Sequence, residues 1–194
     1  MAVRVPVAEG KTRRDQILEV AARLFSERGY HATSMRDIGE ATGILAGSLY
    51  SHIQGKEDLL FGIVQRAADA FLSGLEAVLA TEAPPEEKLR LAMRAHIEVV
   101  AGDPEAARVF HHEWRALSGR RRTEVRKLRR RYEEMWDGIV RELPGAGDPR
   151  AARLLVLSAA NWTYTWYRPD GPMSPQQVAD RFTDLLLDGL GGGD

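Results

Sequence analysis

The stretch 43–60 carries the residues whose types and spacing best suit a chemical task. Ser48, Tyr50 and His52 can donate hydrogen bonds to phosphates or base edges from one short predicted helix. Gly47 lies on the same helix and would let the backbone come close to a partner. This combination suits a helix that lies in the major groove of DNA. An ordinary helical hairpin with a polar face is the alternative interpretation.

Lys56 begins the next predicted helix, where its charge and the free N–H groups both favour a phosphate. Other chemistry has less support. His111 and His112 are adjacent and point about 100° apart on a helix, so they do not suit one metal ion. The chain has no Gly-rich phosphate loop and no Ser-His-Asp motif. We therefore expect no metal, no cofactor and no enzyme activity.

Three short helices must position the stretch 43–60, and they are predicted at about 12–28, 34–42 and 45–52. Gly29 and Gly43 end the first two, since glycine enters the left-handed region at little cost. Ser34 and Asp37 have the spacing of a capping box at the start of the second. Two short helices joined by a tight glycine-containing turn form a helix-turn-helix.

The rest of the chain predicts longer helices, and convincing strand alternation is absent. They are expected at about 56–79, 86–101, 103–117, 119–143, 149–167 and 175–190. The fold class is therefore all-α, with about nine helices. We predict a flexible arm at 1–10, a helix-turn-helix DNA-binding domain at 11–56, a ligand-binding and dimerisation domain at 57–190, and a disordered tail at 191–194.

Composition narrows the class of protein. The chain has 194 residues, 27 Lys and Arg, 28 Asp and Glu, and no cysteine, which excludes disulfides and thiolate zinc sites. The net charge of −1 gives no general attraction to nucleic acid. The N-terminus lacks an apolar signal stretch, and polar residues interrupt the apolar run 154–167, so we expect a cytoplasmic protein with no membrane contact.

The stretch 12–64 closely resembles the DNA-binding domain of the TetR family of bacterial transcriptional regulators. The matching segments are AARLF at 21–25, RGY at 28–30, ATSMRDI at 32–38, SLYSH at 48–52 and KEDLL at 56–60. The resemblance implies a homodimer that binds a palindromic double-stranded operator and represses transcription. Nine positions match those that face DNA in the family: Thr33, Arg36, Ala46, Gly47, Ser48, Tyr50, Ser51, His52 and Lys56.

Within that set, Arg36, Ala46, Gly47 and Ser51 are the candidates for base readout, and the other five are expected to hold phosphates. The family pairs its subunits through the last two helices. Here these helices carry apolar side chains that would form a four-helix bundle across the dyad: Leu154, Leu155, Leu157, Ala160, Trp162, Trp166, Phe182, Leu185, Leu186 and Leu187. A purely intramolecular core is the alternative.

Apolar and aromatic side chains spread over five helices of the C-terminal part could line an effector cavity. The candidate ligand-binding residues are Phe71, Met93, Ile97, Phe110, Trp114, Arg121, Arg122, Trp136, Trp162 and Tyr164, and His96 belongs to the wider apolar set. A plain core is the alternative for each apolar member. The stretch 120–131 holds eight Lys or Arg and one acid. Such a patch suits the phosphates of an acyl-coenzyme A, although a solvated basic helix face explains it equally well.

The segments 161–171, 174–175 and 178–182 resemble the C-terminal signature of one TetR subgroup. Its members repress the catabolism of fatty acids, steroid rings or phenylacetate and release DNA when they bind a CoA thioester. The resemblance therefore implies a repressor of fatty-acid or aromatic-acid catabolism with an acyl-CoA effector. The alternatives are a TetR-type repressor of efflux or another pathway with a different hydrophobic effector, and a helical binding protein that has lost DNA binding.

Overall fold

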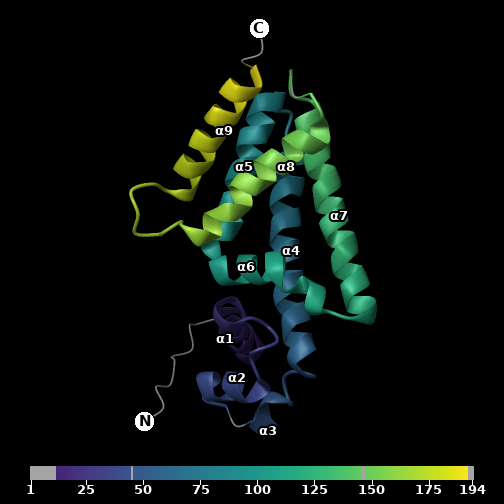
Figure 1. Cartoon of the computed structure of the whole chain (residues 1–194), viewed down its shortest axis with the longest axis vertical. Coiled ribbons are helices and arrows are strands. Elements are labelled where there is room, and N and C mark those ends of the chain that lie inside the picture. Colours follow the sequence, from purple (N-terminus) through teal and green to yellow (C-terminus); the bar gives the residue numbers. More distant parts are fainter. Residues whose placement is uncertain (1–11, 45, 146, 192–194) are drawn as a thin grey trace. The chain divides into compact units, whose positions relative to one another are not determined.

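The computed structural model describes residues 12–44, 46–145 and 147–191. These residues form nine α-helices, two short 3-10 helices and no strand, which confirms the all-α prediction (Figure 1). The α-helices are α1 (Arg13–Arg28), α2 (Met35–Thr42), α3 (Ala46–Leu49), α4 (Lys56–Leu79), α5 (Pro85–Gly102), α6 (Pro104–His112), α7 (Gly119–Arg141), α8 (Pro149–Asn161) and α9 (Pro175–Gly191). The 3-10 helices are η1 (Trp114–Ala116) and η2 (Trp162–Thr165).

The helix starts follow the capping signals of the sequence. The Ser34 hydroxyl accepts a hydrogen bond from the backbone N–H of Asp37, and the Asp37 carboxylate accepts one from the backbone N–H of Ser34. The Asp148 carboxylate likewise accepts from the backbone N–H of Arg150 at the start of α8. These contacts satisfy backbone donors that have no partner within the helix. The predicted capping box of Ser34 and Asp37 is confirmed.

Three predicted helices are shorter in the structure. The helix expected at 45–52 ends at Leu49, and that expected at 149–167 ends at Asn161 before η2. The helix expected at 103–117 ends at His112 before η1. After α3, the Ser51 hydroxyl donates to the carbonyl of Ser48, a local contact that competes with the helical pattern. Tyr50, Ser51 and His52 therefore lie in a turn that follows α3.

The contacts divide the chain into two compact units. Unit 1 runs to Ala67 and also contains Glu105–Val125, whereas unit 2 contains Ala68–Pro104 and the chain from Arg126 onward. The predicted domains 11–56 and 57–190 are consecutive along the chain and stay a prediction, and the compact unit that holds the helix-turn-helix also contains residues 105–125. Helices α4 and α7 contribute residues to both units. The predicted arm at 1–10 lies outside the described residues, as does the tail after Gly191.

The core of unit 1 fixes the helix-turn-helix. Ile17 and Phe25 of α1, Ile38 of α2 and Leu49 of α3 are at most 1% exposed. Gly43 joins α2 to α3 with a φ of 66°, in the left-handed region that favours glycine. These positions alternate with exposed ones, so burying the apolar side of each helix turns the polar side outward.

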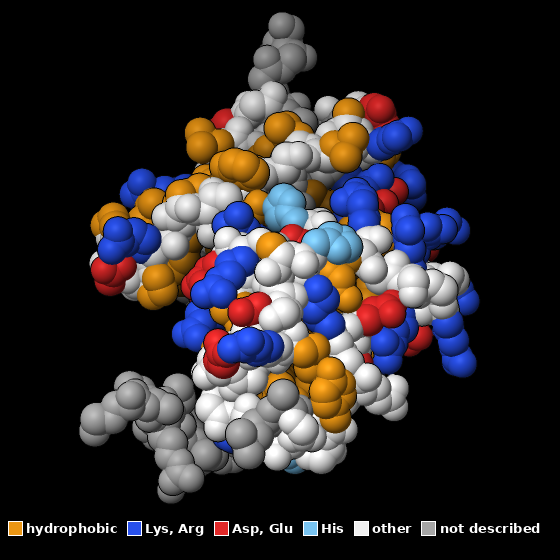
Figure 2. All heavy atoms as spheres, turned by 60° about the horizontal axis from the view of Figure 1, so that its bottom comes forward, with side chains coloured by type: hydrophobic (Ala, Val, Ile, Leu, Met, Phe, Trp, Pro, Cys, Tyr) orange, Lys and Arg blue, Asp and Glu red, His pale blue; other side chains and the backbone are white. Residues whose placement is uncertain are grey.

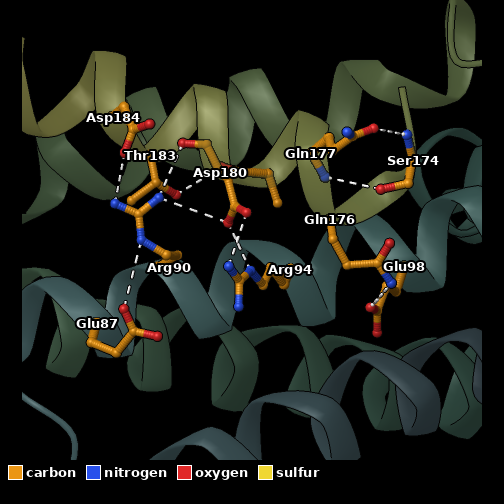
Figure 3. A network of polar contacts seen from close by, with 11 residues as sticks. Glu87, Arg90, Arg94, Glu98, Ser174, Gln176, Gln177, Asp180, Thr183 and Asp184 are labelled. Carbon is orange, nitrogen blue, oxygen red and sulfur yellow. Dashed lines mark hydrogen bonds and ion pairs between the residues drawn. The ribbon is translucent and has the colours of Figure 1, made fainter. Parts of the chain in front are cut away.

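In unit 2, α5 packs along α9, and a network of ion pairs joins the two helices (Figure 3). The Arg94 guanidinium donates to both carboxylate oxygens of Asp180, at 2.7 and 2.9 Å. Arg90 donates to Asp184 at 2.6 Å. The hydrogen bonds from Arg94 hold the pKa of the Asp180 carboxyl below its usual value. This network and the buried side chains of Val178 and Ala179 fix α9 on α5.

Candidate DNA-binding and effector-binding residues

Six of the nine predicted DNA-binding residues lie on the surface of unit 1: Arg36, Gly47, Ser48, Tyr50, Ser51 and His52. Leu49 and Ile53 of the same segment are buried and anchor it. The Tyr50 side chain is 58% exposed, which is unusual for a large aromatic residue. Arg36 forms an ion pair with Glu40 one turn further along α2, so its guanidinium is already oriented on the helix surface. The segment therefore presents a row of hydrogen-bonding groups to solvent.

Gly47 lies in open space on α3. A side chain added there would meet no atom within 4 Å, so the fold itself does not require glycine. An approaching partner can come close to the backbone at this point. The side chain of Ala46 lies outside the described residues, and its predicted contact with a base stays a prediction.

The position of Thr33 differs from what was predicted for the nine DNA-binding residues. Its side chain is 1% exposed, and its hydroxyl donates to the carbonyl of Gly29 at 2.9 Å and contacts that of Leu24 at 3.3 Å. A hydroxyl in this position ties the end of α1 to the loop before α2. It does not face solvent, so the predicted contact of this side chain with a phosphate is wrong. The sequence could not show this, because the burial depends on how the end of α1 meets the loop before α2.

Lys56 has a second task that the sequence did not reveal. Its ammonium group donates to the carbonyls of Tyr30 and Thr33, at 3.0 and 2.9 Å, and lies 4.4 Å from the centre of the Tyr30 ring. An ammonium group has three donors, so one remains for a phosphate. Lys56 thus connects the start of α4 to the loop before α2, and its predicted contact with DNA stays a prediction.

The predicted ligand-binding residues fall into both units, and each unit is described separately. In unit 2, Phe71, Met93, Ile97 and Trp136 are all at most 2% exposed. Tyr164 is half-buried and contacts Trp162, which is exposed. The structure therefore buries four of these six and leaves Trp162 on the surface.

In unit 1, Phe110 and Trp114 are buried, whereas the two predicted arginines differ from each other. Arg121 donates to Asp58 at 3.3 Å and lies over the ring of Phe61. Arg122 is exposed.

Acidic side chains offset part of the basic stretch on α7. Besides the pairing of Arg121, Arg131 pairs with Glu76 at 2.7 Å within unit 2. Figure 2 likewise shows Lys and Arg side chains interleaved with Asp and Glu over the visible face. Local pairing therefore reduces the attraction of this surface for anions.

Sequence reasoning missed a polar group inside unit 2. His96 of α5 is 2% exposed, and its Nδ1 lies 2.7 Å from the hydroxyl of Tyr132 on α7. Trp136 and Asn161 also carry buried polar atoms, described below. His96 appeared in the sequence only as a member of an apolar set. Its partner lies 36 residues away, and only the rotation of both helices brings them together.

Comparison with known families defines the class of protein. Residues 17–63 match the TetR family of bacterial regulatory proteins, and residues 82–190 match the tetracycline-repressor-like C-terminal domain. The second match covers more than half of the chain. The chain therefore belongs to the TetR family, whose members are transcription regulators and not enzymes.

Individual relatives are similar to this chain along nearly its whole length. The transcriptional repressor KstR2 of Rhodococcus jostii is 30% identical, with 92% of this chain and 91% of the relative covered. The fatty acid metabolism regulator protein of Bacillus subtilis is 26% identical, with 90% and 94% covered. The crystal structure of AibR in complex with isovaleryl coenzyme A and operator DNA superimposes with a TM-score of 0.78 at 33% identity, covering 91% of this chain and 98% of AibR. This chain is thus a tetracycline-repressor-like transcriptional regulator.

Among the helices described here, none is long and apolar enough to cross a membrane.

Proposed function

We propose that this regulator binds a palindromic operator as a homodimer, represses transcription, and releases DNA when an acyl-CoA thioester binds unit 2. The observation that carries the DNA-binding part is the row of exposed groups on α3 and the following turn, which the buried side chain of Leu49 anchors. Repression and control of fatty-acid or aromatic-acid catabolism are supported by the similarity to KstR2 and to the Bacillus subtilis regulator.

The DNA-binding part is tested with an operator selected from a pool of random palindromes. Arg36→Ala should weaken binding about tenfold or more, because a good side-chain contact with a base contributes about 1–3 kcal/mol. Arg141→Ala is the matched control, since it removes an exposed arginine from the end of α7 in unit 2. Equal affinities of the two variants, measured by fluorescence anisotropy, would show that the α2–α3 surface does not read DNA.

Exposed apolar side chains of unit 2 support the homodimer. Leu154 and Leu155 of α8, Trp166, and Leu185 of α9 are each between 41% and 71% exposed. Soluble monomers seldom leave several large apolar side chains uncovered on neighbouring elements. A second copy of the chain would cover them by placing α8 and α9 of both subunits together. Recognition helices about 34–36 Å apart, or a multiple of this, would then match successive turns of DNA.

An acyl-CoA effector is supported by the similarity to AibR and by the buried aromatic side chains of unit 2. Thermal unfolding should show a rise in the midpoint with CoA thioesters that is absent with the matching free acids. A ligand at 100 times its dissociation constant stabilises by about 2.7 kcal/mol, which shifts the midpoint by a few degrees. The predicted contact of Arg122, which lies in unit 1, with a phosphate of CoA stays a prediction.

A second candidate is a TetR-type repressor whose hydrophobic effector carries no CoA. The ion pair between Arg121 and Asp58 favours it, because one of the two arginines predicted to bind the effector already has an internal partner. This candidate is supported if neutral hydrophobic compounds raise the midpoint of thermal unfolding and CoA thioesters do not.

A further inference from the structure

Three helices of unit 2 bring buried polar atoms together that have no hydrogen-bond partner. These atoms are Nε2 of His96 on α5, Nε1 of Trp136 on α7, and Oδ1 of Asn161 at the end of α8. His96 is 2% exposed and Trp136 is fully buried. We name His96, Tyr132, Trp136 and Asn161 the His96 cluster.

Ring contacts hold the His96 cluster together. The His96 ring lies 6.0 Å from the centre of the Tyr132 ring and 6.2 Å from that of Trp136. Phe71 of α4 covers the imidazole at 4.8 Å. Packing of this kind fixes the direction in which each polar atom points.

Unpaired polar atoms in a core are costly. Each buried donor or acceptor that lacks a partner disfavours the folded state by about 1–3 kcal/mol, and native proteins contain few of them. Several in one cluster therefore indicate a partner that binds there. Asn161 lies beside His96, and the Trp136 indole lies beside the Tyr132 hydroxyl, but neither pair meets the geometry of a hydrogen bond.

The protonation states of His96 and Tyr132 define which hydrogen bonds the cluster offers to that partner. Burial lowers the pKa of His96 to about 4, so the imidazole is neutral near pH 7. Burial also raises the pKa of the Tyr132 phenol, which keeps its hydrogen and can donate it to Nδ1 of His96. Nε2 of His96 then carries the remaining ring hydrogen. His96 and Trp136 thus offer two N–H donors and no charge.

We propose that the His96 cluster binds a carbonyl oxygen of the effector, through hydrogen bonds from Nε2 of His96 and Nε1 of Trp136. The inference rests on the proposed function, since it assigns the polar contact of an acyl-CoA effector. A carbonyl accepts two hydrogen bonds and carries no charge, so it matches two neutral donors in a core. The oxygen is that of the thioester or that of a keto group on the acyl chain.

Three probes separate these sources of the carbonyl: hexanoyl-CoA, 3-oxohexanoyl-CoA, and S-hexyl-CoA, a thioether that lacks both oxygens. Two hydrogen bonds from the cluster should increase affinity by about tenfold or more. Calorimetry on the wild-type dimer should therefore show that hexanoyl-CoA binds at least tenfold more tightly than S-hexyl-CoA. If the keto oxygen is the one bound, that difference appears only with 3-oxohexanoyl-CoA.

The double variant His96→Phe/Tyr132→Phe tests the cluster itself. It replaces a hydrogen-bonded pair with apolar rings of similar shape, a change that can leave stability nearly unaltered. The advantage of the carbonyl probe should fall several-fold in this variant, because one of the two hydrogen bonds is lost, while the affinity for S-hexyl-CoA stays the same. Trp136→Phe should reduce the advantage too. Tyr30→Phe in unit 1 is the matched control, because it removes a phenol hydroxyl outside the cluster.

The outcomes distinguish the two levels of the proposal. Equal binding of all three probes by the wild-type chain, or an advantage that is unchanged in the double variant, would overturn the carbonyl site and leave the CoA effector in place. Failure of every CoA compound to bind the wild-type chain would overturn both. Urea unfolding of each variant confirms that a lost response does not come from a lost fold.

Discussion

The stability of unit 2 should depend on pH through His96. Its pKa is about 4 in the folded chain and near 6.5 when unfolded. When the pKa of a histidine is lower in the folded chain, the folded state has its full stability at a pH above the pKa of the unfolded chain. This stability is lost as pH falls from about 6.5 toward 4, because the unfolded chain binds the proton more tightly. For these two values, the free energy of unfolding should decrease by about 2 kcal/mol between pH 7 and pH 5.

Urea unfolding at pH 7 and pH 5, at one protein concentration, measures this difference. The double variant His96→Phe/Tyr132→Phe should lose about 2 kcal/mol less than the wild-type chain, because it has no buried imidazole to protonate. His52→Gln is the matched control, since it removes an exposed histidine of unit 1 and should leave the pH dependence unchanged. Equal pH dependence of the wild-type chain and the double variant would refute the argument that His96 is buried and neutral.

Three further predictions concern the surface and the helix contacts. Gly47→Ala should stabilise the chain by up to about 1 kcal/mol, because it fits open space on a helix, yet lower operator affinity several-fold, as urea unfolding and anisotropy would show. Leu185→Asp should raise the dissociation constant of the dimer at least tenfold in sedimentation, because it would bury a charge between the subunits. The helical content should stay unchanged in circular dichroism, because this exposed side chain makes few contacts within the chain. Asp180→Asn should cost roughly 0.5–1 kcal/mol at pH 7, since its pair with Arg94 is partly solvent-screened. Because the pKa of Asp180 is lowered, that difference should vanish in unfolding curves as pH falls below the usual aspartate pKa of 3.8.

The sequence predicted best those features that depend on neighbouring residues. The capping box of Ser34 and Asp37, the cap at Asp148 and the helix from Lys56 to Leu79 follow from short-range spacing, and the structure contains all of them. The exposed side of α3 also follows, since burying Leu49 leaves its neighbours outside. Local signals of this kind are sufficient for fold class and for the exposure of most of the candidate DNA-binding residues.

Contacts between distant segments could not be predicted. Thr33 is buried because its hydroxyl meets carbonyls of α1, and Arg121 pairs with Asp58, 63 residues away. The pairing of His96 with Tyr132 requires particular rotations of α5 and α7. Apolar periodicity defines which side of a helix is buried, but not which polar atom on that side meets another. The candidate effector site therefore needed the structure.

Within unit 1, residues at the start of α4 contact the start of α7 and the loop before α2. The carboxylate of Glu57 accepts hydrogen bonds from the backbone N–H and the hydroxyl of Ser118, at 2.7 and 2.9 Å, and Asp58 pairs with Arg121. Within unit 1, the starts of α4 and α7 are thus tied to each other, and both helices continue into unit 2. Lys56, the preceding residue, holds the loop before α2. Lys56 thus ties the start of α4 to that loop. If the effector weakens DNA binding as we propose, linkage requires that DNA weakens effector binding by the same factor.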